Sequence, residues 1–141
     1  MRAVAVASAK TWLGTPYRHQ ASARGYGADC LGLVRGVWRE LCGVEPVRVP
    51  PYTSDWSEAE QEERLWEAAR HHLTEVARLP EPGDVLLFRM RERGVAKHLG
   101  ILSASDATPR FIHAYQGHGV VESPFSAPWR RRAIAVFEFP R

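Results

Sequence analysis

The spacing of apolar residues changes once along this chain, near Gly83, and that change limits the folds open to it. Apolar residues recur at helical spacing before this point, whereas short apolar runs typical of strands follow it. These runs lie at residues 85–88, 99–102, 111–115, 120–121 and 133–139. Helices followed by strands with short connections favour an α+β fold, in which N-terminal helices pack on a central antiparallel sheet of about five strands.

A glycine-rich loop separates the first two predicted helices. Residues 2–13 form the first helix, which ends at Gly14. The loop covers residues 21–27, and Asp29 is the expected N-cap of a second helix over residues 30–41.

The second helix carries two signs of close packing. One stripe of it is apolar and comprises Leu31, Val34, Trp38 and Leu41. Gly32 and Gly36 reduce helix propensity, and glycines retained at such positions indicate close approach by a neighbouring segment. We therefore expect this helix to be buried.

A third helix is predicted after a proline-rich connection. Ser57 and Glu60 form a capping box at its start. Apolar residues then recur at helical spacing, at Leu65, Ala69, Leu73 and Val76. Pro80 ends the pattern, and we expect His71 and His72, near the end of the helix, to lie on the surface.

Length and charge narrow the class of protein further. The chain has 141 residues, 45% of them hydrophobic, which suits one core and hence a single domain over residues 1–141. Its net charge is only +3, and the main basic cluster, Arg130 to Arg132, is expected to be a solvated turn before the last strand. This excludes a nucleic-acid binder with a broad basic stripe.

The N-terminus shows neither a signal peptide nor a membrane span. Ser8 and Lys10 interrupt its apolar run well short of about 20 residues. We expect no membrane association, and a chain that stays where it is made or leaves by another route.

The two cysteines have different expected roles. Twelve residues along one helix would separate Cys30 and Cys42 by roughly 18 Å, well beyond the roughly 7 Å that a disulfide spans, so both should be free thiols. Cys30 stands at a helix N-terminus after a glycine-rich loop, where a nucleophile would be placed, although a small buried apolar role suits it as well. Asp29 would raise the pKa of the thiol, so a nucleophilic Cys30 needs an imidazole close in space. Cys42 is interpreted as structural.

Two histidines on predicted strands could supply that imidazole. His98 faces away from Leu99 on its strand and beside Gly100, which leaves open space there. His113 likewise opposes its apolar neighbours on the next strand. If the strands are adjacent, both imidazoles share one face of the sheet and can meet the thiol as base and orienting group.

Five sequence blocks occur in an order that resembles a known family. They are GTPY at 14–17, ADCLGL at 28–33, PGDV at 82–85, HLGI at 98–101 and FIHA at 111–114. In this order they resemble the NlpC-type cell-wall peptidases, papain-like cysteine enzymes that cut the peptide stems of bacterial peptidoglycan. The resemblance implies a papain-like fold and an enzyme that needs no cofactor or metal.

The resemblance also implies catalytic roles. Cys30 would be the nucleophile, His98 the general base and then acid, and His113 the residue that orients His98. The family usually has serine after the nucleophile, but this chain has Leu31, which removes a hydroxyl near the site.

Further residues are candidates for binding the substrate and the oxyanion. Tyr17 falls where the family places a tyrosine that lines the site, and Gln20 and Asp29 complete this group. Arg24 is the nearest basic residue in the loop and suits the carboxylates of a stem peptide. The implied substrate bond joins D-γ-glutamate to a diamino acid.

The compact form of the chain resembles one branch of the family. The segments GTPYRHQ, RGVWREL and AVFEFP look most like proteins encoded with tail genes of phages and gene transfer agents. This implies tail proteins as partners, and a chain made in the cytoplasm without a signal peptide that acts at the cell wall from a tail.

Two other readings stay open. His98, His113 and Cys30, with Asp84 as a fourth ligand, could hold zinc, although no pair of these has the close spacing usual for zinc ligands. The chain could also be a catalytically silent tail or wall-binding component that keeps the fold.

Overall fold

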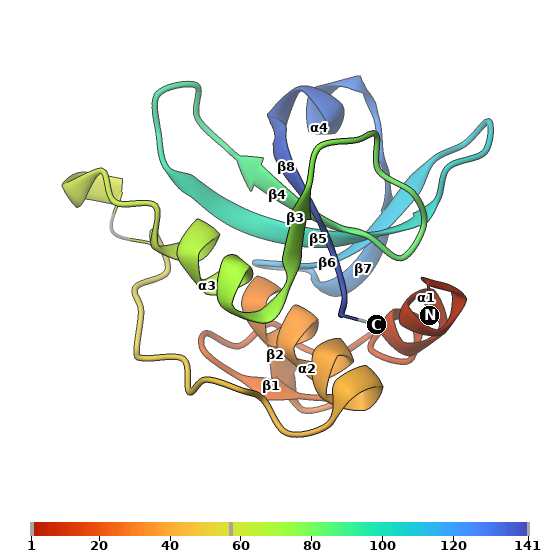
Figure 1. Cartoon of the computed structure of the whole chain (residues 1–141), viewed down its shortest axis with the longest axis horizontal. Helices are drawn as coiled ribbons and strands as arrows, with labels where there is room; N and C mark the ends of the chain where they lie inside the picture. Colours follow the sequence, from red (N-terminus) through yellow and green to blue (C-terminus); the bar gives the residue numbers. More distant parts are fainter. Residues whose placement is uncertain (1, 57, 141) are drawn as a thin grey trace.

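The computed structural model describes residues 2–56 and 58–140 as four α-helices, one short 3-10 helix and eight strands (Figure 1). The helices are α1 (Arg2–Lys10), α2 (Cys30–Cys42), η1 (Glu58–Glu60), α3 (Arg64–His72) and α4 (Ala127–Arg132). The strands are β1 (Ser22–Ala23), β2 (Gly27–Ala28), β3 (Thr74–Val76), β4 (Val85–Arg89), β5 (Ala96–Ala104), β6 (Arg110–Tyr115), β7 (Gly119–Pro124) and β8 (Ala133–Glu138).

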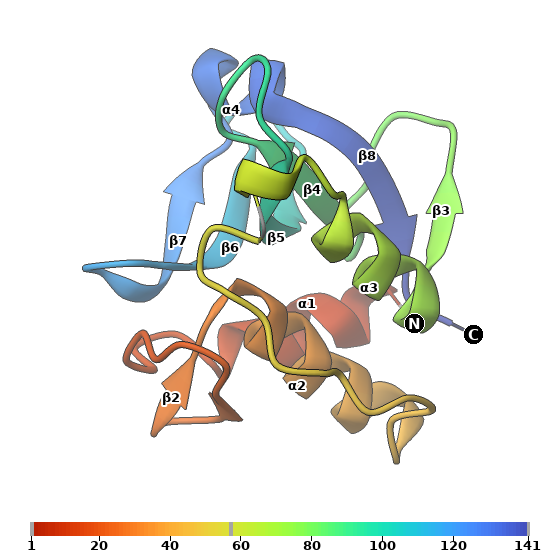
Figure 2. The ribbon, with the colours of Figure 1, turned by 90° about the vertical axis from the view of Figure 1, so that its left-hand side faces the viewer.

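The main sheet is antiparallel and has six strands in the order β3-β8-β4-β5-β6-β7, while β1 and β2 form a small hairpin. The α+β prediction is therefore confirmed, with one strand more than expected. Helices α1, α2 and α3 contact β5 on one face of the sheet, and α4 contacts β4 and β8 (Figure 2). Within the described residues, no helix has the length and apolar character needed to cross a membrane.

Two apolar clusters follow from the alternation of side chains along the strands. The larger cluster lies between the helices and the sheet and includes Leu99, Ile101 and Ile112. The second cluster contains Phe88 and Phe111, with Trp129 of α4 packed against it. Successive strand residues face opposite sides of the sheet. The residues that alternate with Leu99, Ile101 and Ile112 therefore face α4.

Helix α2 has the predicted cap and the predicted close contacts. Asp29 Oδ1 accepts from the backbone N–H of Gly32 at 2.7 Å. A Cβ on Gly36 would lie 2.0 Å from the Trp12 ring, and one on Gly32 would lie 1.8 Å from the carbonyl oxygen of Ala21. Glycine is therefore required at both positions by neighbouring atoms, which lets the buried helix sit against α1 and the glycine-rich loop.

The third helix is shorter than the sequence predicted. The expected cap, Ser57, lies outside the described residues, and α3 covers only Arg64–His72. Residues 74–76 form β3 instead, in register with β8 from Thr74↔Glu138 to Val76↔Val136. Backbone hydrogen bonds to a distant strand outweigh the local helical spacing there, since each segment's N–H and C=O groups need partners.

The surface prediction also fails for His72. His71 is exposed, but His72 is only 5% exposed, and its Nε2 lies 3.1 Å from Glu45 Oε1. The Trp38 indole donates to the His72 carbonyl at 2.6 Å. These contacts join α3 to α2 and to the chain that follows α2.

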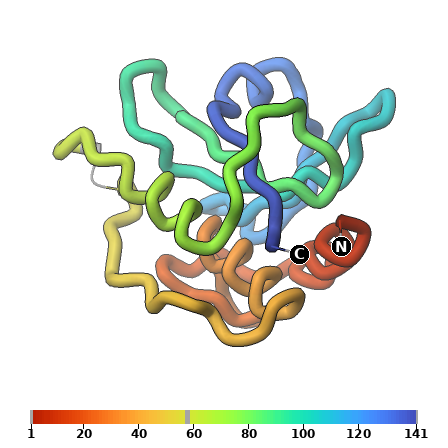
Figure 3. The backbone as a smooth tube through the Cα atoms, viewed as in Figure 1, coloured from red at the N-terminus to blue at the C-terminus, as the bar shows by residue number. Residues whose placement is uncertain are grey.

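The two ends of the described chain lie side by side (Figure 3). The Asp84 carboxylate is fully buried and forms ion pairs with Arg2 at 2.5 Å and with Arg78 at 2.7 Å. Both arginines also bind Glu138 of β8 at 2.8 Å. This cluster ties α1, the β3–β4 connection and β8 together, and it holds the pKa of Asp84 below its usual range.

The basic cluster near the C-terminus is helical. Arg130, Arg131 and Arg132 are exposed, as expected, but they form the end of α4, whereas a turn was predicted. Pro128 in the first turn of α4 suits a helix start because its missing N–H would have no helical partner there.

Candidate active site

A cleft of about 380 Å³ opens where the start of α2 meets the sheet. Cys30 and His98 both line it, together with Tyr17 and Asp29. Its remaining lining residues are His19, Tyr52, Ser54, Asp55, Trp56, Met90, Lys97, Ala114, Tyr115 and Gln116. The structure thus brings the predicted nucleophile and the predicted base to one cavity.

Cys30 is the first residue of α2 and is 6% exposed. Its Sγ lies 4.0 Å from the carbonyl oxygen of Lys97, the residue before His98. Burial and the neighbouring Asp29 carboxylate raise the pKa of the thiol to about 12, although nearby backbone N–H groups oppose this. The resting sulfur is therefore protonated.

His98 and His113 form a direct pair. His98 Nε2 lies 2.7 Å from His113 Nδ1, so the imidazoles of β5 and β6 meet as the strand alternation predicted. Burial lowers the pKa of His98 to about 3, and the neighbouring His113 adds to this shift. Burial lowers the pKa of His113 to about 4, and here His118 adds to the shift. Both rings are neutral at pH 7.

Aromatic rings surround the pair. Phe111 lies 4.2 Å from His113 between ring centroids, and Trp129 of α4 lies 5.2 Å from His113 and 5.7 Å from His98. Gly100 makes this packing possible, because a Cβ there would lie 2.7 Å from the Phe111 ring. The apolar rings exclude water from one side of the imidazoles and restrict their rotation.

His113 has a second partner that the sequence analysis missed. Its Nε2 lies 2.9 Å from Ser123 Oγ on β7. The register of β6 and β7 pairs Phe111 with Ser123, so Ser123 and His113 are diagonal neighbours on one face. Strand alternation in both segments was a signal that could have suggested this contact.

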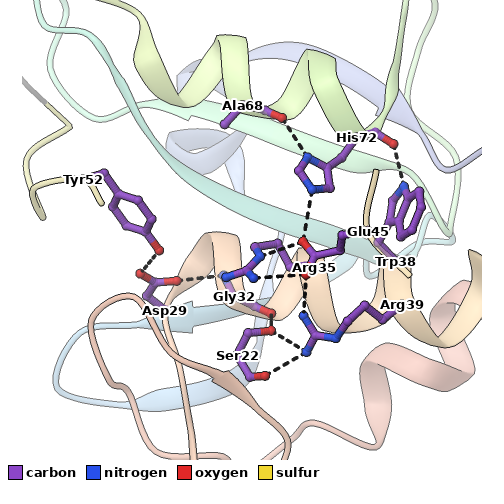
Figure 4. A network of polar contacts seen from close by, with 10 residues as sticks. All are labelled: Ser22, Asp29, Gly32, Arg35, Trp38, Arg39, Glu45, Tyr52, Ala68 and His72. Atoms are coloured by element: carbon purple, nitrogen blue, oxygen red, sulfur yellow. Dashed lines mark hydrogen bonds and ion pairs between the residues drawn. The ribbon is translucent and has the colours of Figure 1, made fainter. Parts of the chain in front are cut away.

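Asp29 acts as an acceptor for three donors. It accepts from the N–H of Gly32 and from the Tyr52 hydroxyl, the latter at 2.5 Å (Figure 4). It also accepts from the backbone N–H of Gln20 at 2.7 Å. The carboxylate thereby joins the helix start, the glycine-rich loop and the chain after α2. These contacts give Asp29 a structural role next to Cys30.

The segment that carries Tyr52 is a wall of the cleft that the sequence analysis did not identify. Its ring stacks on Trp56 at 4.0 Å. Further back, Glu45 binds Arg35 at 2.8 Å and His72 at 3.1 Å, which anchors the same segment to α2 and α3 (Figure 4). Hydrogen bonds from Arg35, Arg39 and His72 lower the pKa of Glu45 to about 2 despite its burial.

The other candidate binding residues have different positions. Tyr17 is half-buried in the cleft, and burial raises the pKa of its hydroxyl to about 12, so this group stays protonated and can donate. Gln20 is exposed and is absent from the lining; its side chain donates to the Tyr52 carbonyl at 2.6 Å. Leu31, which stands where the family usually has serine, is 1% exposed, and its side chain packs in the core.

Arg24 does not provide positive charge to the cleft. It binds Thr11 at 3.1 Å and Glu40 at 3.4 Å on the far side of the loop. Lys97 lines the cleft instead.

The four residues of the zinc hypothesis do not come together. Asp84 lies in the ion-pair cluster with Arg2 and Arg78, away from the histidine pair. Among residues 2–56 and 58–140, no group of three or more His, Cys, Asp and Glu side chains is arranged to hold a metal ion.

A thiol at a helix start that shares a cleft with a paired imidazole is the arrangement that cysteine hydrolases use. The chain belongs to the NlpC/P60 family, whose model matches residues 14–138. Members of this family are cell-wall hydrolases that use cysteine. The comparison with curated proteins gave no match.

Two solved structures illustrate the likeness. One is a lipoprotein-like NLP/P60 family protein from Staphylococcus aureus subsp. aureus Mu50, with 18% identity and a TM-score of 0.61. The other is an NlpC/P60 family protein from Bacillus cereus ATCC 10987, with 16% identity and a TM-score of 0.67. The alignments cover 99% of this chain but only 41% and 40% of those chains, so the likeness concerns the fold.

Proposed function

We propose that the chain is a cysteine peptidase that hydrolyses peptide stems of bacterial peptidoglycan. The observation that carries the proposal is the pairing of His98 with His113 in the cleft that also holds Cys30. Family membership supports the substrate class.

The first step joins the thiol to the substrate. Because His98 Nε2 faces His113, its Nδ1 is the nitrogen that accepts the Cys30 proton. The sulfur attacks the amide carbon, and the carbonyl π electrons move to oxygen. The Cys30 backbone N–H and the Tyr17 hydroxyl are donors available to this oxyanion.

The second and third steps release the products. His98 gives its proton to the leaving nitrogen as the carbon–nitrogen bond breaks, which leaves an acyl group on Cys30. Water then attacks the acyl carbon and passes a proton to His98. The sulfur leaves and regains that proton, so the enzyme returns to its starting state.

The bond that we propose is cut joins D-γ-glutamate to a diamino acid. Its support is the resemblance of the five sequence blocks to NlpC-type peptidases. The cleft carries side chains of both signs, Lys97 and Asp55, which suits a stem peptide with carboxylate and amino groups.

We propose a phage-like or gene transfer agent tail as the setting. The segments GTPYRHQ, RGVWREL and AVFEFP support it through their resemblance to tail-encoded members. Tail proteins would then be the partners, and the tail would bring the peptidase to the wall. Detection of the chain by mass spectrometry in purified tail particles tests this setting, and its absence from them contradicts it.

The activity is tested with a free stem peptide that contains D-γ-glutamyl-diaminopimelate. We expect one new amino group per cut, at that bond, with no new reducing sugar ends and no effect of a chelator. Cys30→Ser should remove cleavage, because an alcohol is a poorer nucleophile beside this imidazole. Cys42→Ser is the matched control, since Cys42 is exposed at the far end of α2.

Three results would contradict the peptidase proposal. Full activity of the serine variant excludes the thiol mechanism. Loss of activity with a chelator, restored by zinc, favours the metal hypothesis. Binding to peptidoglycan without any cleavage favours a catalytically silent wall-binding component.

A further inference from the structure

The hydrogen-bonded chain does not end at the two histidines. His98 Nε2 lies 2.7 Å from His113 Nδ1, and His113 Nε2 lies 2.9 Å from Ser123 Oγ. The result is a chain of hydrogen-bonded side chains that leads away from the cleft. Strands β5, β6 and β7 contribute one residue each to it.

Each neutral imidazole has one N–H and one bare nitrogen, so this hydrogen-bonded chain has two consistent arrangements of protons. In one, the Ser123 hydroxyl donates to His113 Nε2, His113 Nδ1–H donates to His98, and His98 carries its proton on Nδ1. In the other, every donor is reversed, and His98 Nδ1 is bare. Only the second arrangement lets His98 accept a proton from the thiol.

We propose that Ser123 is a positioning residue that accepts the His113 Nε2–H and thereby keeps the Nδ1 atoms of both histidines unprotonated. This proposal rests on the proposed function, because it assigns His98 Nδ1 as the base. Ser123 acts through His113 and does not touch the reacting atoms.

The surroundings support a fixed arrangement. His113 is 1% exposed and His98 is 7% exposed. A ring nitrogen that lost its hydrogen-bond partner could therefore not bond to water instead, which would be costly. Trp129 and Phe111 pack on the rings and oppose a flip that would exchange the nitrogens. Both rings are neutral at pH 7, so the choice of tautomer matters.

The strand register gives Ser123 this position. Phe111 pairs with Ser123 and His113 pairs with Val121, which puts Ser123 diagonally across from His113 on the same face. A slip of one residue would turn its hydroxyl to the opposite face.

The direct test is imidazole nitrogen NMR of the protein at pH 7. We expect both histidines to be protonated at Nε2 and bare at Nδ1. Ser123→Ala should shift His113 toward the Nδ1–H form, and Ser123→Thr, which keeps a hydroxyl and suits a strand, should restore the original tautomer. Ser103→Ala is the control, because Ser103 donates to Glu122 at 2.7 Å and does not contact His113.

Kinetics supply the second readout. Ser123→Ala should lower kcat about 10- to 100-fold, the range found when hydrogen-bond partners of metal-binding histidines are removed, with little change in KM. Protonation of His113 at Nδ1 in the unaltered protein would overturn the proposal, and so would unchanged tautomers and kcat in Ser123→Ala. If the tautomers are as expected but no stem peptide is cut, the proposed function fails while the assignment of Ser123 to the histidine pair stands.

Discussion

At the scale of single residues, the Cys30 thiol and the two imidazoles are uncharged before the reaction begins. Burial raises the pKa of Cys30 to about 12 and lowers that of His98 to about 3, so the proposed mechanism requires a proton to move between them when the sulfur attacks. With the tautomers proposed above, His113 Nδ1 accepts the His98 Nε2–H at 2.7 Å and holds the ring in place while it carries the proton. The two histidines therefore have different functions and should respond differently to substitution.

We predict that His98→Ala lowers kcat by about 10²- to 10⁴-fold, the range that general acid–base catalysis contributes. His113→Asn should be milder, because the asparagine oxygen can take the place of Nδ1 and accept from His98. Steady-state kinetics with the stem peptide measure both. Equal and complete losses in two folded variants would show that His113 is more than an orienting residue.

At the scale of elements, helix α2 positions Cys30, the proposed nucleophile, by packing closely on its neighbours. Its N-terminus is fixed by Asp29, and its middle lies against the Trp12 ring at Gly36. Trp12 is itself held by the Glu40 carboxylate, which accepts its indole N–H at 3.1 Å. A side chain at Gly36 cannot be accommodated without moving α2 or the ring.

We predict that Gly36→Ala destabilises the protein by about 1–3 kcal/mol, the usual cost of overpacking, despite the gain of about 1 kcal/mol in helix propensity. Urea unfolding measures the change. Combining it with Trp12→Phe should recover part of the loss, because a smaller ring makes room. Additive effects of the two substitutions would contradict the contact as the cause.

At the scale of the whole molecule, the same buried groups that form the site make folding sensitive to acid. The folded pKa values of His98 and His113, about 3 and about 4, lie below the value of about 6.5 expected for an unfolded chain. The unfolded chain therefore binds protons first as the pH falls. Glu45, with a pKa of about 2, and Asp84 add to the loss at lower pH, because they too bind protons more readily when unfolded.

We predict that stability is greatest at neutral pH and falls between pH 6.5 and pH 4, by about 1.4 kcal/mol per pH unit for each of the two histidines. Urea unfolding across this range measures the slope. His113→Asn should make it shallower, since one titrating group is removed. An unchanged slope in that variant, or stability that rises toward acid, would contradict the assignment.

Local patterns in the sequence were sufficient for several features of the fold and site. The cap at Asp29 and the start of α2 at Cys30 depend on neighbours within a few residues, and both are observed. The separation of helices from strands near Gly83 holds for the main elements only, because β1, β2 and β3 precede this point and α4 follows it. The meeting of His98 and His113 needed only strand alternation and adjacent strands. Such features are predictable because the residues that determine them are close in sequence or share one strand pairing.

Other features were decided by tertiary structure. Residues 74–76 become strand β3 because β8, about 60 residues later, supplies their backbone partners, and His72 is buried because Glu45 and Trp38 reach it from other elements. The Ser123 contact likewise requires the register of β6 and β7. Periodicity tells which face a side chain takes, but it carries no information on which distant segment covers that face. That choice is made by pairing of backbone hydrogen bonds and by burial across the whole chain.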